Sequence, residues 1–212
     1  MRVRMMSGTL GCVMALTGVF GFAGATPAGA STGSYRLVRR LSTYIGTIPD
    51  SVQREIDTVR SEADLPRLSA AAQKVITTPS IEVVEVGRAP DPRASYATGV
   101  GKVGTGCYLV VVSRKRENVL GWVLFSAKTT VRNWCENGIV MTSIPSVQRD
   151  STAHWGWTAC GWTNVYTGWL HVRTRYVATG ESMFARANAC WTPKILKSEA
   201  QVRGNGYYTW IA

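Results

Sequence analysis

The most aromatic stretch of the chain reads His154-Trp155-Gly156-Trp157-Thr158-Ala159-Cys160-Gly161-Trp162. It lies in the middle of residues 107–212, which hold all eight tryptophans of the protein and four of its five cysteines. Large aromatic side chains supply much of the buried area in a protein core. The core and its covalent framework are therefore expected in residues 107–212.

Short apolar runs with a period of two fill residues 107–212, separated by turn residues and free of helical patterns. Asn137-Gly138 indicates a two-residue hairpin turn, because both residues accept a positive φ. Residues 114–118 are polar and indicate another turn, and residues 169–177 alternate as one strand that Gly180 would end. This pattern predicts roughly seven or eight short strands and hence a mainly β fold, an antiparallel β-sandwich or barrel.

The four cysteines of this half form an even set, which in an exported chain is typical of two disulfides. Zinc is the competing interpretation, but no two of these cysteines stand two to four residues apart, as structural zinc sites usually require. Three pairings are possible, and we prefer Cys107–Cys135 with Cys160–Cys190. Each disulfide would stabilise the fold by roughly 3–4 kcal/mol in the chain-entropy description.

The N-terminus has the features of a secretory signal peptide. Arg2 and Arg4 precede a long uncharged run that ends in Ala28-Gly29-Ala30, so cleavage is expected after Ala30 and the protein is expected to be extracellular. The alternative is a membrane anchor. The run is interrupted by Gly11, Gly18, Gly21, Gly24 and Pro27, which disfavours an anchor, and no second segment is long and apolar enough to cross a bilayer.

The remaining chain divides into three parts. Residues 31–80 are expected to be a helical segment with amphipathic helices at about 51–62 and 65–76, and Asp50 offers an N-cap for the first. This segment would serve as a stalk, a pro-segment or a cap on the β domain. Residues 81–106 are expected to form an edge strand and a Gly/Pro-rich linker, and residues 107–212 the disulfide-bonded β domain.

The protein is basic, with a formal charge of +11 that falls to +9 when Arg2 and Arg4 leave with the signal peptide. Such a surface attracts anionic cell-wall polymers, acidic polysaccharides, nucleic acid or anionic lipid. A secreted location makes nucleic acid the least fitting of these partners. The alternative is that the charge only keeps the protein soluble, because the basic residues are scattered singly.

Three segments resemble small exported proteins of high-GC Gram-positive bacteria. They are the tryptophan beside a hairpin turn, the Gly-aromatic segment and the closing Gly-Asn-Gly-aromatic turn, here Trp134-Cys135-Glu136-Asn137-Gly138, Gly156-Trp157 and Gly204-Asn205-Gly206-Tyr207-Tyr208. The resemblance covers under half of the chain. It implies a secreted β-sandwich and brings no catalytic residue to this sequence.

Catalytic patterns are weak. Thr152-Ala153-His154 is similar to the segment around the histidine of trypsin-like proteases, but the nucleophile loop of that family is missing. His154 and His171 are the only histidines, which is too few for a typical catalytic zinc site. A carboxylate pair for glycoside hydrolysis is the least excluded enzyme, with candidates Glu117, Glu136, Asp150, Glu181 and Glu199. These acids lie near turns, which favours solvated carboxylates, so we predict no catalytic, cofactor-binding or metal-binding residue.

Aromatic residues give the best indication of a binding site. Trp155 and Trp157 would share one face of a strand, and Trp169 and His171 would form a similar pair. With Arg173 and Arg175 they would make a basic platform for sugar rings. The alternative is that these rings fill the core, as we expect for Trp122, Trp134 and Trp162.

These observations favour a secreted, non-enzymatic binding module for a cell-envelope or other extracellular polymer. Two alternatives stay open. One is a secreted toxin, antimicrobial protein or protease inhibitor, and the other is a polymer hydrolase with a carboxylate pair.

Overall fold

The computed structural model describes residues 34–41, 47–91, 106–204 and 208–211. The expected signal peptide and its cleavage site after Ala30 lie outside these residues, as do most of the expected linker and the turn at 205–206. No helix within the described residues is long and apolar enough to span a membrane.

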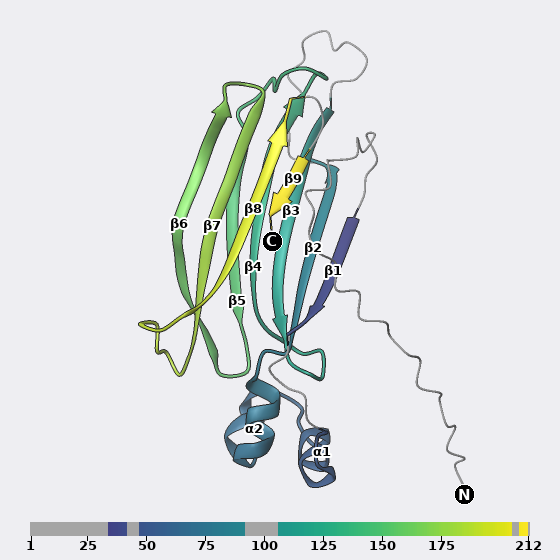
Figure 1. Ribbon diagram of the computed structural model, residues 1–212, viewed down its shortest axis with the longest axis vertical. Coiled ribbons are helices and arrows are strands. Elements are labelled where there is room, and N and C mark those ends of the chain that lie inside the picture. The colour runs from purple at the N-terminus through teal and green to yellow at the C-terminus, as the bar shows by residue number, and fades with distance from the viewer. Residues whose placement is uncertain (1–33, 42–46, 92–105, 205–207, 212) are drawn as a thin grey trace, which may run out of the picture.

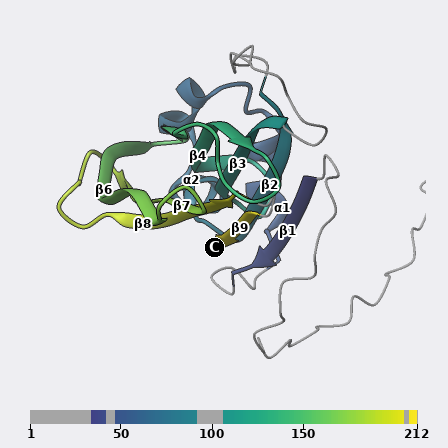
Figure 2. The same cartoon turned by 90° about the horizontal axis from the view of Figure 1, so that it is seen from above.

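Two antiparallel sheets form the body of the protein, as the sequence predicts (Figures 1 and 2). The first sheet has the order β1-β2-β3-β4-β5, and the second has the order β6-β7-β8-β9. The strands of the first sheet are β1 (Ser34–Arg40), β2 (Ile81–Pro90), β3 (Gly106–Glu117), β4 (Val123–Glu136) and β5 (Ser146–Ala153). Those of the second are β6 (Trp157–His171), β7 (Arg175–Arg186), β8 (Lys194–Arg203) and β9 (Tyr208–Ile211).

The core lies between the two sheets. Side chains at alternate positions of each strand point inward, so Val84, Val112 and Val131 of the first sheet meet Ala178 and Ala200 of the second. A second cluster surrounds stacked Phe125 and Phe184, whose ring centroids are 4.6 Å apart. Trp134 is fully buried and donates from Nε1 to the carbonyl of Arg203, as its expected core position requires.

Both preferred disulfides are confirmed. Cys107 and Cys135 are directly opposite each other on β3 and β4. Cys160 on β6 is bonded to Cys190 in the loop between β7 and β8. The first disulfide therefore joins two strands of one sheet, and the second ties a loop to its neighbouring strand.

The helical residues cover one end of the two sheets (Figure 1). They comprise α1 (Asp50–Asp57), the 3-10 helix η1 (Glu62–Arg67) and α2 (Ala70–Thr77), so the helices are shorter than predicted. Two caps explain the bounds: a capping box between Ser61 and Asp64 starts η1, and the Ser69 hydroxyl accepts from Ala72 N at the start of α2. Their apolar faces pack against Leu120, Trp122 and Trp155, which lie in turns at this end of the sheets.

Two strands of the first sheet, β1 and β3, differ from the prediction. β1 occupies residues expected to be an irregular or helical lead, and its pairing to β2 makes β2 an interior strand and not the predicted edge. Residues 114–117 continue β3 and do not form the predicted polar turn. Their charges are tolerated in a strand because Glu82 pairs with Arg114 and Arg116 on the inner face, while Glu85 pairs with Lys115 on the outer face.

Two predicted turns also differ from the structure. The loop after β4 spans four residues between the bridged pair Glu136 and Met141, and within it only Gly138 has a positive φ. Residues 169–177 do not form one strand, because β6 and β7 are joined by a tight turn in which Arg173 has a φ of 60°. Gly180 lies inside β7, where the Trp162 ring occupies the space that a Cβ atom would need.

Candidate functional site

Trp155 and Trp157 do not share a face. Trp155 has a φ of 57° in the turn before β6, stacks on Trp122 with ring centroids 4.8 Å apart, and packs against the helices. Trp157 is buried, donates from Nε1 to the carbonyl of Thr77, and packs 4.6 Å from Phe125. Both rings therefore fasten the helices to the sandwich, and neither offers the open platform that the sequence suggests.

Trp169, His171, Arg173 and Arg175 lie at the other end of β6, far from this pair (Figure 1). The Trp169 ring meets Tyr176 edge-on at 5.2 Å and packs on the core. Arg175 is half-buried and donates to Gln201 Oε1, while His171 and Arg173 are exposed. The predicted platform is thus divided between two ends of the molecule, and its three tryptophan rings, Trp155, Trp157 and Trp169, pack in structural positions.

The two histidines are also apart. His154 Nδ1 lies 2.8 Å from Glu62 Oε1, beside the helices, whereas His171 lies at the opposite end of β6. Among the described residues no group of three or more His, Cys, Asp and Glu side chains is placed to hold a metal ion.

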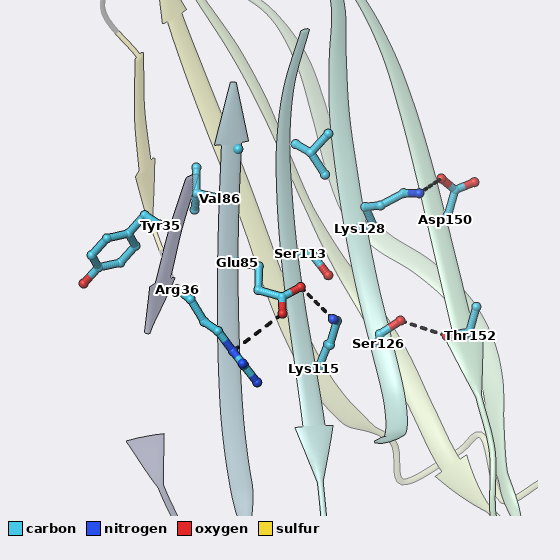
Figure 3. Close-up of a pocket in the computed structure, with 12 residues that line it drawn as sticks. Tyr35, Arg36, Glu85, Val86, Ser113, Lys115, Ser126, Lys128, Asp150 and Thr152 are labelled. Atoms are coloured by element: carbon cyan, nitrogen blue, oxygen red, sulfur yellow. Dashed lines mark hydrogen bonds and ion pairs between the residues drawn. The ribbon is translucent and has the colours of Figure 1, made fainter. Parts of the chain in front are cut away.

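A groove on the outer face of the first sheet gathers polar side chains from all of its strands (Figure 3). Strand register places five residues in one continuous row across the sheet, namely Arg36, Glu85, Ser113, Lys128 and Asp150. A neighbouring row on the same face contains Lys115, Ser126 and Thr152. The groove has a volume of ≈ 660 Å³, and Tyr35, Val86, Gly87 and Val111 complete its lining.

Ion pairs and hydrogen bonds hold these side chains in place. Glu85 lies 3.7 Å from Arg36 and 2.6 Å from Lys115, and Lys128 lies 3.5 Å from Asp150. The hydroxyls of Ser126 and Thr152 are hydrogen-bonded at 2.8 Å. The groove therefore presents fixed cations, carboxylates and hydroxyls, which together can donate to and accept from a polar ligand.

The two carboxylates of the groove are too far apart for glycoside hydrolysis. Glu85 is on β2 and Asp150 on β5, so two strands separate them, which corresponds to about 14 Å at the usual strand spacing. Glycosidase pairs stand roughly 5–10 Å apart. Glu136 is buried and accepts from Gly138 N, and Glu181 accepts from Asn164. The groove can thus bind, but it does not supply the pair that a hydrolase needs.

Sequence reasoning missed the groove because it depends on register between distant strands. The sequence indicates Asp150 only as a candidate catalytic acid, and it places Lys115 in a predicted turn. One signal was available: Glu82 and Glu85 in the run 81–86, and Arg114, Lys115 and Arg116 after 107–112, are opposite charges in neighbouring β-rich segments. Such charges favour cross-strand pairs.

Comparisons with known proteins give no match: no family model, no curated protein and no solved structure is found that resembles this chain.

Proposed function

We propose that this protein is an extracellular binding module, and that the groove on the β1–β5 sheet holds an extended segment of a cell-envelope or other extracellular polymer. The carrying observation is the row of charged and hydroxyl side chains that crosses all five strands of the sheet. Support for the compartment comes from the two disulfides, since disulfides persist in oxidising surroundings, and from the signal peptide that the sequence predicts.

The chemistry of the groove suits a polymer that carries both hydroxyl and acidic groups. Arg36, Lys115 and Lys128 can donate to carboxylate or phosphate oxygens, and Glu85 and Asp150 can accept from hydroxyls. Because these side chains already pair with one another, binding needs little further ordering of long, mobile chains. The ligand would cross the strands and contact several of them at once.

The test is retention of the oxidised protein on insoluble cell walls and on a panel of neutral and acidic polysaccharides, at low and moderate salt. Lys115→Ala/Lys128→Ala removes two cations from the groove. The matched control, Lys194→Ala/Lys197→Ala, removes two exposed lysines of β8, which do not line the groove. We expect the groove variant to lose about 10- to 100-fold in affinity, because it removes two hydrogen-bond donors and a typical net hydrogen bond contributes about 1 kcal/mol, and we expect the control to bind normally.

Equal losses in both variants would mean that binding reflects net charge alone, and the groove would not be the site. Salt separates the same two cases, because attraction between exposed charges is screened at moderate ionic strength. Absence of retention on every polymer would overturn the proposal.

A further inference from the structure

Two loops meet at the end of the sandwich opposite the helices. One is the loop of residues 137–145 between β4 and β5, and the other is the turn Val172–Thr174 between β6 and β7. Met141 N donates to the carbonyl of Arg173 at 2.6 Å, and Gly204 N donates to that of Thr174 at 3.0 Å. These contacts join the loops into one surface.

Three large aliphatic side chains project from this surface. Ile139 is 76% exposed, Ile144 is 73% exposed and Val172 is 77% exposed, whereas most large apolar residues of the sheets are buried. An isolated exposed apolar residue is ordinary, but three on two adjoining loops form a patch that calls for a partner. We call Ile139, Ile144 and Val172 the tip residues.

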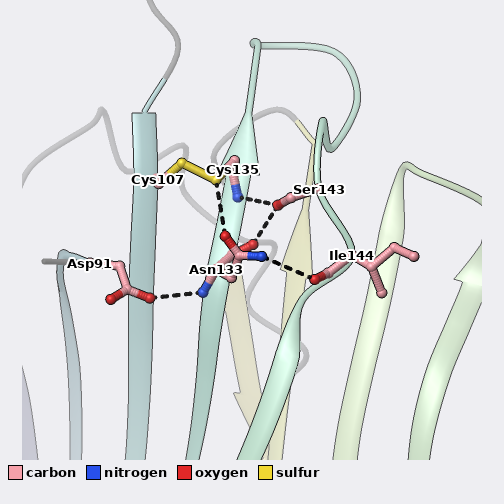
Figure 4. Close-up of a disulfide and its surroundings, with 6 residues drawn as sticks. All are labelled: Asp91, Cys107, Asn133, Cys135, Ser143 and Ile144. Carbon is pink, nitrogen blue, oxygen red and sulfur yellow. Dashed lines mark hydrogen bonds between the residues drawn. A yellow bond between two sulfur atoms is a disulfide. The ribbon is translucent and has the colours of Figure 1, made fainter. Parts of the chain in front are cut away.

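The loop holds its tip residues in a fixed position. Asn137 Oδ1 accepts from Ile139 N and Val140 N, and Glu136 Oε2 accepts from Gly138 N. Ser143 Oγ accepts from Cys135 N and donates to the carbonyl of Asn133, beside the Cys107–Cys135 disulfide (Figure 4). Figure 4 also shows that the Ile144 side chain points away from this network. The loop therefore presents its apolar side chains outward at no further cost of ordering.

The charge around the tip residues is positive. Residues 137–145 contain no charged side chain, and Leu170-His171-Val172-Arg173-Thr174 contributes one arginine and one histidine. Arg173 and His171 are exposed, whereas the nearby Glu136 is buried and already accepts a hydrogen bond from Gly138 N. An apolar patch with a cationic edge complements a surface that is apolar inside and anionic outside.

We propose that this end of the sandwich binds the surface of an anionic lipid bilayer, with the tip residues at the boundary of headgroups and acyl chains and Arg173 against lipid phosphates. Lipid fits better than a protein partner for a reason of composition. Interaction hot spots between proteins are enriched in Trp, Tyr and Arg, and Leu and Val are under-represented there. The tip residues include no aromatic side chain. Separate aliphatic loop tips need only a fluid apolar phase, and basic neighbours add attraction to anionic lipid.

The experiment is flotation of the oxidised full-length protein with phosphatidylcholine vesicles, with or without about a third of phosphatidylglycerol, which supplies the anionic surface. We expect binding to the anionic vesicles and little to the neutral ones. Ile139→Ser/Ile144→Ser/Val172→Ser should weaken binding about 1000-fold, because burial of each of the three aliphatic side chains contributes roughly tenfold. Arg173→Ala should weaken it about fivefold, and only on anionic vesicles.

A matched control replaces three aliphatic residues exposed elsewhere, Val38→Ser/Val165→Ser/Ile195→Ser. Near-ultraviolet circular dichroism checks that both triple variants fold. Normal binding by the control and loss by the tip variant supports the proposal. The proposal is overturned if both triple variants lose binding equally, or if no vesicle binding is seen at all. It is also overturned if binding is lost only in Trp191→Ala, a variant of the ring that is 82% exposed near the helix-covered end. If the tip residues instead bind a protein that has no affinity for vesicles, the patch belongs to a protein partner and the lipid proposal is likewise overturned.

The groove and the tip residues can be tested separately. Lys115→Ala/Lys128→Ala lies on the outer sheet face and should leave vesicle binding unchanged, and the tip variant should leave polymer retention unchanged. Failure of either proposal therefore leaves the other standing.

Discussion

The two ends of the sandwich differ in whether their apolar turn residues are covered. Each has turns that carry large apolar side chains, Leu120, Trp122 and Trp155 at one end and the tip residues at the other. At the first end, α1, η1 and α2 cover these side chains and add a core of their own. At the second end the tip residues stay exposed. Apolar turns are thus a stabilising feature at one end and an available binding surface at the other.

Trp157→Ala should show the largest effect on this comparison. The ring packs on Phe125 and its Nε1 donates to the carbonyl of Thr77, so it joins the sandwich core to the end of α2. Truncating a buried tryptophan costs about 3–5 kcal/mol of the free energy of unfolding. Val172→Ala at the open end should change it by less than about 0.5 kcal/mol. Urea denaturation measures both, and similar effects would mean that the ends do not differ in packing.

Removing each disulfide in turn should show whether the two ends also differ in how much their covalent cross-links stabilise the fold. Cys107–Cys135 and Cys160–Cys190 span 28 and 30 residues, so the chain-entropy account gives each about 3–4 kcal/mol. Cys107→Ser/Cys135→Ser and Cys160→Ser/Cys190→Ser should therefore destabilise the protein almost equally, by denaturant titration. If removal of one disulfide leaves the free energy of unfolding unchanged while removal of the other lowers it by the full amount, the two ends differ in their cross-links as well as in being covered by helices.

Glu62→Ala should loosen the helix-covered end alone. The two carboxylate oxygens lie 2.8 Å from His154 Nδ1 and from Trp155 N, across the boundary between helices and sandwich. The pair is half-exposed, so we expect a loss of about 1 kcal/mol. Hydrogen exchange should quicken in α1 and α2 and stay unchanged in β7. Glu181→Ala, which removes a hydrogen bond to Asn164, is the matched control, and faster exchange in the helices there would argue against a local role for Glu62.

The fold class and the disulfides could be predicted because their signals are local. Strands of period two, turn residues and an even cysteine count are visible without knowing which strands pair. The sequence does not indicate β1, because Arg36, Arg39 and Arg40 are typical of a solvated segment. The strand depends on distant partners: all of Ser34–Arg40 pairs with β2, and Leu37 packs on the core. The β6–β7 turn was missed because alternation continues through Val172–Thr174, where no glycine, proline or asparagine marks a turn.

The candidate sites could not be predicted for a related reason. The groove requires the register Glu85–Ser113–Lys128–Asp150 across four strands, which no local pattern contains. Trp155 and Trp157 are two residues apart, which would place them on one face only if both were in a strand. The positive φ of Trp155 and Gly156 breaks that relation: Trp157 lies in the cluster around Phe125, whereas Trp155 packs at the border between that cluster and the helices. The backbone conformation of this single turn therefore prevents the two rings from forming the expected platform.

The smallest expected effect is a pH dependence at the helix-covered end. Backbone hydrogen bonds from Arg60 N and Ser61 N lower the pKa of the Asp64 carboxyl in the capping box of η1 below its usual value of 3.8. Because the folded pKa is depressed, the stabilisation is present above the unfolded pKa and is lost as pH falls through the folded value. Asp64→Asn cannot titrate, so its stability should fall less steeply below about pH 4 than that of the wild type. Denaturant titrations between neutral pH and pH 3 measure this. Parallel stability curves for the wild type and Asp64→Asn would contradict this prediction. The control is Asp57→Asn, exposed on α1, because no backbone hydrogen bond to the Asp57 carboxylate is present in the described helix.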